Sequence, residues 1–208
     1  EDYKLPRGTQ DFLPLTSEKI SYIEYMLKSV AGLYGYHEIR TPIFEHTNLF
    51  LRSVGESSDI VNKEMYTFLD KGGRSITLRP EGTAGVMRAF VENKMYALPD
   101  TPIKLYYDGP VFRYERPGAG RYRQITQFGF ECLGVHSPLI DAELILMNTS
   151  MLYMLGIKDF VVNLDISDSL GSTLSDVNLF IDSEIKATSF RHPNSKSATL
   201  NATFSSDD

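Results

Sequence analysis

The segment from Lys104 to Gly134 restricts the possible folds of this chain more than any other, because it reads as two strands joined by a short loop. KLYYDGPVFRYE and RQITQFGFECLG are rich in aromatic and β-branched residues, and RPGAGRY lies between them. Such a pair predicts a hairpin. It therefore favours an antiparallel sheet over a series of alternating βαβ units.

One face of this predicted hairpin is polar. Side chains alternate across a strand, so Arg113 and Glu115 share a face of the first strand, and Gln127 and Glu131 share a face of the second. From spacing alone, a solvated surface and the floor of a polar ligand site are about equally good interpretations. Gly129 favours the site slightly, because a glycine inside a strand suggests that something approaches the backbone there.

The loop region concentrates positive charge in a chain whose formal net charge is -6. Four arginines fall between Arg113 and Arg123. A guanidinium offers a planar fork of donors that suits phosphate oxygens, so Arg113, Arg121 and Arg123 would surround a polyphosphate. Glu115 could orient an arginine or accept from a nucleotide amino group, and Glu131 could hold an ammonium. We expect a ligand with phosphates at one end and an amine at the other.

Helices and further strands flank the hairpin in sequence. Apolar spacing predicts helices over Ser17–Tyr34, Thr83–Leu98 and Ser137–Gly156, strands within 36–45 and 160–166, and a hairpin over 64–81 that turns at Lys71–Gly73. The mixture indicates an α+β fold with a largely antiparallel sheet. We predict a core over residues 1–166. Residues 167–208, rich in Ser, Thr, Asn and Asp, would form a polar tail, a loosely packed appendage or a truncated second half.

Composition excludes several classes of protein. With 208 residues, of which 42% are hydrophobic, the chain can build one sizeable core. Its single cysteine forms no internal disulfide, and its four histidines show no metal-ligand spacing. It has no apolar run of membrane-spanning length and no signal-peptide pattern at the N-terminus, so we expect a cytoplasmic protein without membrane partners. The acidic balance argues against a general nucleic-acid coat but allows a local basic site.

Four ordered segments resemble class II aminoacyl-tRNA synthetases and, in detail, the histidyl-tRNA synthetase family. FRYERPGAGRYRQITQFGFE is similar to motif 2, with its Arg-x-Glu strand, variable loop, second arginine and returning strand. KLPRGTQDFLP resembles the family's N-terminal signature, GYHEIRTPIFE resembles motif 1 with Pro42 at the dimer-interface position, and TLRPEGTAGVMRAFVEN resembles the first histidine-site segment. The resemblance runs from about Lys4 to Gly171.

This resemblance implies a class II synthetase-like antiparallel sheet flanked by helices, and a role for each matched residue. Arg113 would be catalytic, binding the α-phosphate of ATP and stabilising the charge that develops as the histidine carboxylate attacks. Glu115 would hold the adenine and Arg121 the outer phosphates, with Mg²⁺ bridging phosphate oxygens. The residues that match the histidine pocket are Glu81, Thr83, Gln127 and Glu131.

Structural interpretations stand beside these roles. Glu81 follows Pro80 and would equally cap the helix that begins near Thr83. Arg79 and Arg88 are expected to be surface or ion-pair residues. The aromatic residues expected in the core rather than in stacking roles are Tyr106, Tyr107, Phe112 and Phe130.

The chain also departs from the family pattern. Ile125 stands where motif 2 usually has an adenine-stacking Phe. No second histidine segment, no glycine-rich motif 3 with its ATP-binding arginine and no anticodon-binding domain can be found in the sequence.

Three functions follow from these matches and departures. The first is a histidine-tRNA ligase, or a fragment of one, that joins histidine to tRNA(His) through histidyl-adenylate and forms a homodimer through motif 1. The second is a catalytically incomplete, histidine-sensing regulatory subunit of ATP phosphoribosyltransferase, which the missing motif 3 favours. The third is a non-catalytic interaction protein. Binding of ATP would separate the first from the second, and binding of histidine would separate both from the third.

Overall fold

The computed structural model describes residues 3–54, 64–118, 121–135, 137–162, 186–188 and 201–202. The chain divides into two compact units. The first comprises Glu1–Thr16, Glu38–Pro99 and Tyr107–Gly129, and the second comprises Ser17–His37, Asp100–Tyr106 and Phe130–Asp208. Within the described ranges, no helix combines the length and the apolar character needed to cross a membrane.

The predicted hairpin strands are confirmed as β5 (Ile103–Phe112) and β6 (Gln124–Leu133). They are neighbours in a sheet of order β1-β5-β6, in which β1 is His37–Glu38. Both long strands pass through both units. Strand β5 ends at Phe112, so Arg113 and Glu115 lie just beyond it and not within it, in contrast to the sequence prediction.

The first unit also contains a small antiparallel sheet of order β2-β4-β3, formed by Phe44–His46, Ser75–Leu78 and Thr67–Leu69. Its β3–β4 turn is the predicted one at Lys71–Gly73. Asp70 holds this turn by accepting hydrogen bonds from the backbone N–H groups of Gly72 (2.8 Å) and Arg74 (2.9 Å). Gly73 has φ 76°, a conformation that glycine adopts without steric cost. Together these antiparallel pairs and the flanking helices confirm the α+β prediction.

A row of hydroxyl groups runs through this small sheet. Thr67 Oγ1 lies 2.8 Å from Thr77 Oγ1, Thr77 Oγ1 donates to Thr47 Oγ1 at 2.9 Å, and Thr47 Oγ1 lies 2.7 Å from Ser75 Oγ. Thr67 and Thr77 are directly opposite each other in the β3–β4 register. The buried hydroxyl of Thr77 is therefore satisfied on both sides.

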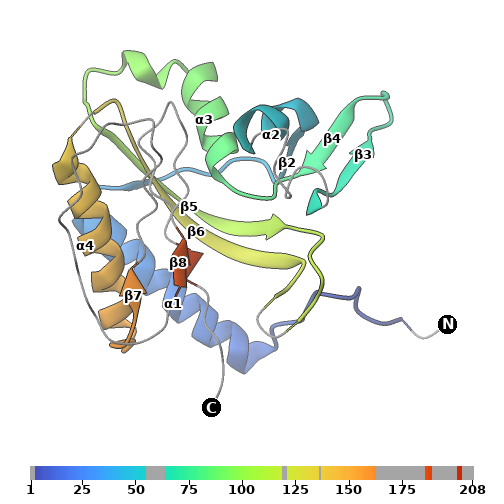
Figure 1. The fold of residues 1–208 in the computed structure, drawn as a ribbon, viewed down its shortest axis with the longest axis horizontal. Helices are drawn as coiled ribbons and strands as arrows, with labels where there is room; N and C mark the ends of the chain where they lie inside the picture. Colours follow the sequence, from blue (N-terminus) through green and yellow to red (C-terminus); the bar gives the residue numbers. More distant parts are fainter. Residues whose placement is uncertain are drawn as a thin grey trace. The chain divides into compact units, whose positions relative to one another are not determined.

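Two helices complete the first unit, and Figure 1 shows α2 (Thr47–Val54) beside α3 (Thr83–Glu92). Helix α2 was not predicted. Helix α3 ends six residues before the predicted Leu98, because Lys94 adopts a left-handed conformation with φ 52°. A 3₁₀ turn follows at Met95–Ala97. The predicted end of this helix was therefore wrong.

Helix α1 (Pro14–Leu33), from Ser17 onward, and helix α4 (Pro138–Met154) belong to the second unit, and both were predicted. Ser137 caps α4 by accepting a hydrogen bond from the N–H of Leu139 at 3.3 Å, and Gly156 follows the helix at φ 82°. The buried apolar side chains of this unit include Val30, Ala31, Phe130, Leu144, Met147, Met151, Leu152 and Phe160.

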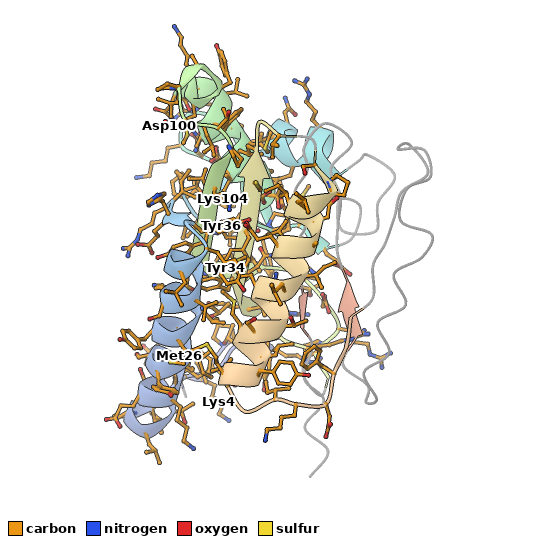
Figure 2. All side chains as sticks on the ribbon, turned by 90° about the vertical axis from the view of Figure 1, so that its left-hand side faces the viewer. Lys4, Met26, Tyr34, Tyr36, Asp100 and Lys104 are labelled. Carbon is orange, nitrogen blue, oxygen red and sulfur yellow. The ribbon has the colours of Figure 1, made fainter. Side chains whose placement is uncertain are left out.

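A polar cluster lies inside the second unit. Lys104 Nζ donates to Glu143 Oε1 at 2.6 Å and to the carbonyl of Tyr34 at 3.2 Å, and it lies 5.4 Å from the centroid of the Tyr36 ring (Figure 2). Burial, more than any neighbouring charge, raises the pKa of Tyr36 and that of the adjacent thiol Cys132. Both groups are therefore neutral at physiological pH.

Three short strands close the described part of the chain. β7 (Val161–Val162) pairs in parallel with β8 (Lys186–Thr188), which pairs antiparallel with β9 (Asn201–Ala202). The predicted strand over 160–166 is described only through Val162. The predicted boundary after residue 166, and most of the predicted tail, lie outside the described residues.

Candidate functional site

The candidate site is built around the turn that starts α3 in the first unit. Glu81 places its carboxylate over the first helical amides, accepting hydrogen bonds from the N–H groups of Thr83 and Ala84, the latter at 3.0 Å. Free N–H groups at a helix start favour negative charge. Glu81 therefore caps α3, which is the structural interpretation that the sequence left open.

Gln127 reaches the same turn from strand β6. Its Oε1 accepts a hydrogen bond from the Gly82 N–H at 2.9 Å. The side chain is buried, at 9% exposure, so the prediction of a half-exposed polar face does not hold at this position. The bond joins residues 45 positions apart in sequence, and it places Glu81, Thr83 and Gln127 around one backbone turn.

Arg113 approaches this turn from the end of β5. Its Nε donates to the carbonyl of Pro80 at 2.9 Å, and its Nη1 lies 4.0 Å from Glu115 Oε1. Its backbone N–H donates to the carbonyl of Arg123 at 3.0 Å, so pairing between the two hairpin arms continues for one residue past the strand. Arg113 thus links the helix start to Glu115.

The Glu81 carboxylate has a raised pKa. Burial is the largest cause, and the hydrogen bonds from Ala84 and Thr83, together with the charge of Arg113, oppose it. A carboxylate that is poorly solvated when ionised gains from a positively charged neighbour. A positive charge beside this carboxylate would favour its ionised form.

The two remaining arginines of the predicted phosphate cluster differ from each other. The guanidinium of Arg123 lies 3.8 Å above the ring of Tyr114, and its Nε donates to the Glu115 carbonyl at 3.2 Å. Its backbone N–H donates to the Gly8 carbonyl at 2.7 Å. The side chain of Arg123 thus packs on the hairpin, and its phosphate role stays a prediction. Arg121 is exposed, and its backbone pairs with Gly118.

Gly129 is explained by packing and not by a ligand. A Cβ at this position would lie 2.2 Å from Cζ of Tyr107, so it is the tyrosine ring that approaches the backbone. The inference from Gly129 to a ligand site was therefore wrong. Tyr106, Tyr107 and Phe130 are buried, as the sequence predicted.

Glu131 belongs to the second unit and is fully buried, at 0% exposure. Of the seven residues that the sequence assigned to a site, four lie at or beside the α3 turn in the first unit: Glu81, Thr83, Arg113 and Gln127. Glu115 is adjacent to Arg113, and Arg121 lies in the exposed loop. Ala119 and Gly120 of that loop lie outside the described residues.

Arg79 is buried, although its sequence position suggested a surface or ion-pair residue. It is 7% exposed, not at the surface, and its Nε donates to the Pro110 carbonyl at 2.8 Å. Nη1 lies 3.3 Å from the carbonyl of Thr41 and 3.4 Å from its hydroxyl. Arg79 directly follows strand β4 and precedes Pro80, and this position was the one feature of the sequence that could have indicated its burial. Arg88, by contrast, forms the expected ion pair, with Glu45 at 2.8 Å.

Metal ligands do not gather in the part of the chain that the structure describes. Among those residues, no group of three or more His, Cys, Asp or Glu side chains could hold an ion. The site therefore presents hydrogen-bond donors, an arginine and carboxylates.

Comparisons with known proteins agree with the four matched segments. The family model described as "Histidyl-tRNA synthetase" matches residues 8–199. The histidine–tRNA ligase of Geobacillus kaustophilus (strain HTA426) is 62% identical over 156 residues, which cover 75% of this chain and 37% of the relative. The crystal structure of apo S. aureus histidyl-tRNA synthetase aligns with TM-score 0.65 and 51% identity, over 76% of this chain and 36% of that one.

A second solved structure carries a double description. It is an ATP phosphoribosyltransferase regulatory subunit/histidyl-tRNA synthetase from Bacillus halodurans C, with TM-score 0.63 and 26% identity over 74% of this chain and 38% of that one. The chain spans a little over a third of the length of the curated relatives that it matches.

Proposed function

The chain belongs to the histidyl-tRNA synthetase family, and from this premise we propose that it carries part of the site at which a histidine–tRNA ligase activates its amino acid. In this reaction the carboxylate of histidine attacks the α-phosphorus of ATP, and pyrophosphate leaves. The histidyl group then passes from the adenylate to the 3′ end of tRNA(His), and AMP is released. ATP and tRNA(His) are thus the proposed co-substrates.

The α3 turn is the observation that carries the proposal for histidine. The N–H groups of Thr83 and Ala84 hold the Glu81 carboxylate at this turn, and it would bind the α-ammonium of histidine, which would favour the ionised form that burial disfavours. Gln127 and Thr83, at the same turn, would add polar contacts. Glu131, a buried carboxylate, would bind the imidazole. Polar binding groups of this kind disfavour apolar amino acids, because the polar atoms would be left unpaired.

Arg113 is the proposed catalytic residue. Its Nε is held by the Pro80 carbonyl, so the guanidinium is oriented before any ligand arrives. The Nη end would contact the α-phosphate and stabilise the negative charge that accumulates as the carboxylate attacks. Glu115 would accept from the adenine amino group, and Arg121 would contact the outer phosphates. Mg²⁺ would be brought by ATP and would neutralise the pyrophosphate.

Binding measurements on this chain test the proposal with two variants. Arg113→Ala should weaken ATP binding by about tenfold or more and change histidine binding little, because a charge-assisted hydrogen bond to phosphate is worth about 1.5–3 kcal/mol. Glu131→Ala should weaken histidine binding and change ATP binding little. Arg74→Ala is the control, since Arg74 is exposed in the β3–β4 turn. Titration calorimetry with each ligand, together with histidine-dependent exchange of pyrophosphate into ATP, gives the readout.

Two results would reject this assignment. If the wild-type chain is folded and binds neither histidine nor ATP, the site is not functional in this chain. If both variants lose the two ligands equally, the residues act only on the fold.

The regulatory-subunit function is the second candidate. The Bacillus halodurans C structure supports it, but its 26% identity is well below the 51% found with the S. aureus synthetase. Binding of histidine without ATP would favour the regulatory subunit. Family membership also leads us to propose a cytoplasmic homodimer formed through residues 35–45, and sedimentation equilibrium would test the dimer.

A further inference from the structure

Two glycines of the candidate site need explanation. Gly82 has φ -97° and ψ -24°, which other residues adopt readily, and Gly129 is not among the glycines with positive φ. Backbone conformation therefore does not require glycine at either position. Something must occupy the space that a side chain would fill.

A single aromatic ring occupies both spaces. A Cβ on Gly82 would lie 2.2 Å from Cε2 of Tyr107, and a Cβ on Gly129 would lie 2.2 Å from its Cζ and 2.3 Å from its hydroxyl oxygen. Such separations are far below van der Waals contact. The ring is 3% exposed. It contacts the α3 turn on one side and strand β6 on the other, and it leaves no room for a Cβ at Gly82 or Gly129.

We propose that Tyr107 is a positioning residue for the amino-acid site, a spacer whose ring sets the distance between the α3 turn and strand β6. The turn carries Glu81 and Thr83, and the strand carries Gln127. The inference rests on the proposed function, because it assigns these three residues to histidine. It adds a residue that contacts no substrate and determines where the contacting residues lie.

The hydrogen bond from the Gly82 N–H to Gln127 depends on the distance between the α3 turn and strand β6. It spans the same gap as the ring, at 2.9 Å, and such bonds weaken steeply once the donor and acceptor separate or misalign. A smaller side chain at position 107 would allow the α3 turn to move closer to strand β6, and the Gly82–Gln127 hydrogen bond would lose its alignment. A longer separation would break it. The ring therefore selects one arrangement of the three side chains.

Three variants separate spacing from general core damage. Tyr107→Phe keeps the ring, Tyr107→Leu removes it, and Tyr106→Leu makes the same change at a neighbouring buried position. We expect Tyr107→Phe to resemble the wild type. Tyr107→Leu should accelerate hydrogen exchange at the Gly82 amide and raise the Kd for histidine, each by about tenfold or more, as expected for loss of one buried hydrogen bond. The Kd for ATP should change by less than about threefold.

The Tyr106→Leu control distinguishes a specific loss of spacing from general damage to the core. Tyr106→Leu should lower the urea midpoint and leave the Gly82 exchange and the histidine-to-ATP affinity ratio unchanged. If Tyr107→Leu behaves like Tyr106→Leu in both readouts, the spacer role is refuted. If the wild-type chain fails to bind histidine, the proposed function fails, yet the exchange rate of Gly82 still decides whether the ring fixes the turn.

A fourth variant guards against a Tyr107→Leu protein that does not fold. Gly129→Ala retains the ring and adds a methyl group against it from the strand side. We expect faster Gly82 exchange and weaker histidine binding here too, because the ring must move toward the turn. Unchanged Gly82 exchange in a folded Gly129→Ala variant would overturn the proposal.

Discussion

Replacement of Arg79 by methionine tests how much a buried arginine contributes to the first unit. Its Nε donates to the Pro110 carbonyl at 2.8 Å, and Nη1 makes two longer contacts with Thr41. Its backbone also bridges two segments, since its N–H donates to Ile43 O at 2.8 Å and its carbonyl accepts from the Phe112 N–H at 2.9 Å. Methionine retains the backbone bonds and the apolar stem but removes every side-chain donor.

The expected loss follows from these contacts. A fully buried carbonyl left without its donor costs about 1–3 kcal/mol, and the part-buried Pro110 carbonyl would lose its donor. The longer contacts with Thr41 add about 0.5–1.5 kcal/mol. Burial itself opposes the guanidinium, since desolvation lowers the pKa of Arg79, and removing the charge recovers part of the loss. We therefore expect Arg79→Met to destabilise the fold by about 2–4 kcal/mol.

Equilibrium unfolding in urea measures this difference, followed by circular dichroism at constant pH and salt. Arg79→Lys keeps the charge without the planar fork, and we expect it to lose most of the same stability. Arg74→Met serves as the exposed control and should match the wild type. A loss below about 0.5 kcal/mol for Arg79→Met would mean that desolvation cancels the hydrogen bonds, and the reasoning would be wrong.

Two other predictions concern the helix starts. Burial raises the pKa of Glu81, so its contribution to stability is fullest below the unfolded pKa and declines as pH rises through the folded one. The Glu81→Gln variant has no carboxylate here, so its free energy of unfolding should improve relative to the wild type from about pH 4 to pH 7. Urea titrations measure this difference. Parallel plots of unfolding free energy against pH would contradict the raised pKa of Glu81. Ser137→Ala removes the cap on the Leu139 N–H and should cost about 1 kcal/mol in thermal unfolding. Ser150→Ala, within the same helix and away from its start, is the control and should show little change.

Local pattern was sufficient for the regular elements. Helices α1 and α4 and strands β5 and β6 carry long periodic runs, and each was predicted within a few residues of its bounds. Helix α2 has eight residues, too few for a clear period, and it was missed. The end of α3 depends on the left-handed conformation of Lys94, a residue type that rarely adopts it, so no sequence signal marked it.

The candidate site was harder to predict, because its side chains are positioned by residues distant in sequence. The pattern of a glycine between polar residues was read correctly as close approach to the backbone at Gly129, but the approaching group is Tyr107, which spacing cannot reveal. Arg79 is buried because carbonyls of two other segments surround it. Glu81, Thr83, Arg113 and Gln127 were assigned through family resemblance, and their assigned roles remain predictions.

The row of hydroxyls from Thr67 through Thr77 and Thr47 to Ser75 has a consequence for how the small sheet responds to change. Each hydroxyl has one proton to give, and Thr77 gives its proton to Thr47, so the bond between Thr67 and Thr77 uses the proton of Thr67. The orientation of one hydroxyl in this row thus depends on the next. Replacement of Thr77 by valine would separate Thr67 from Thr47 and Ser75, and each remaining hydroxyl would then orient by its own surroundings.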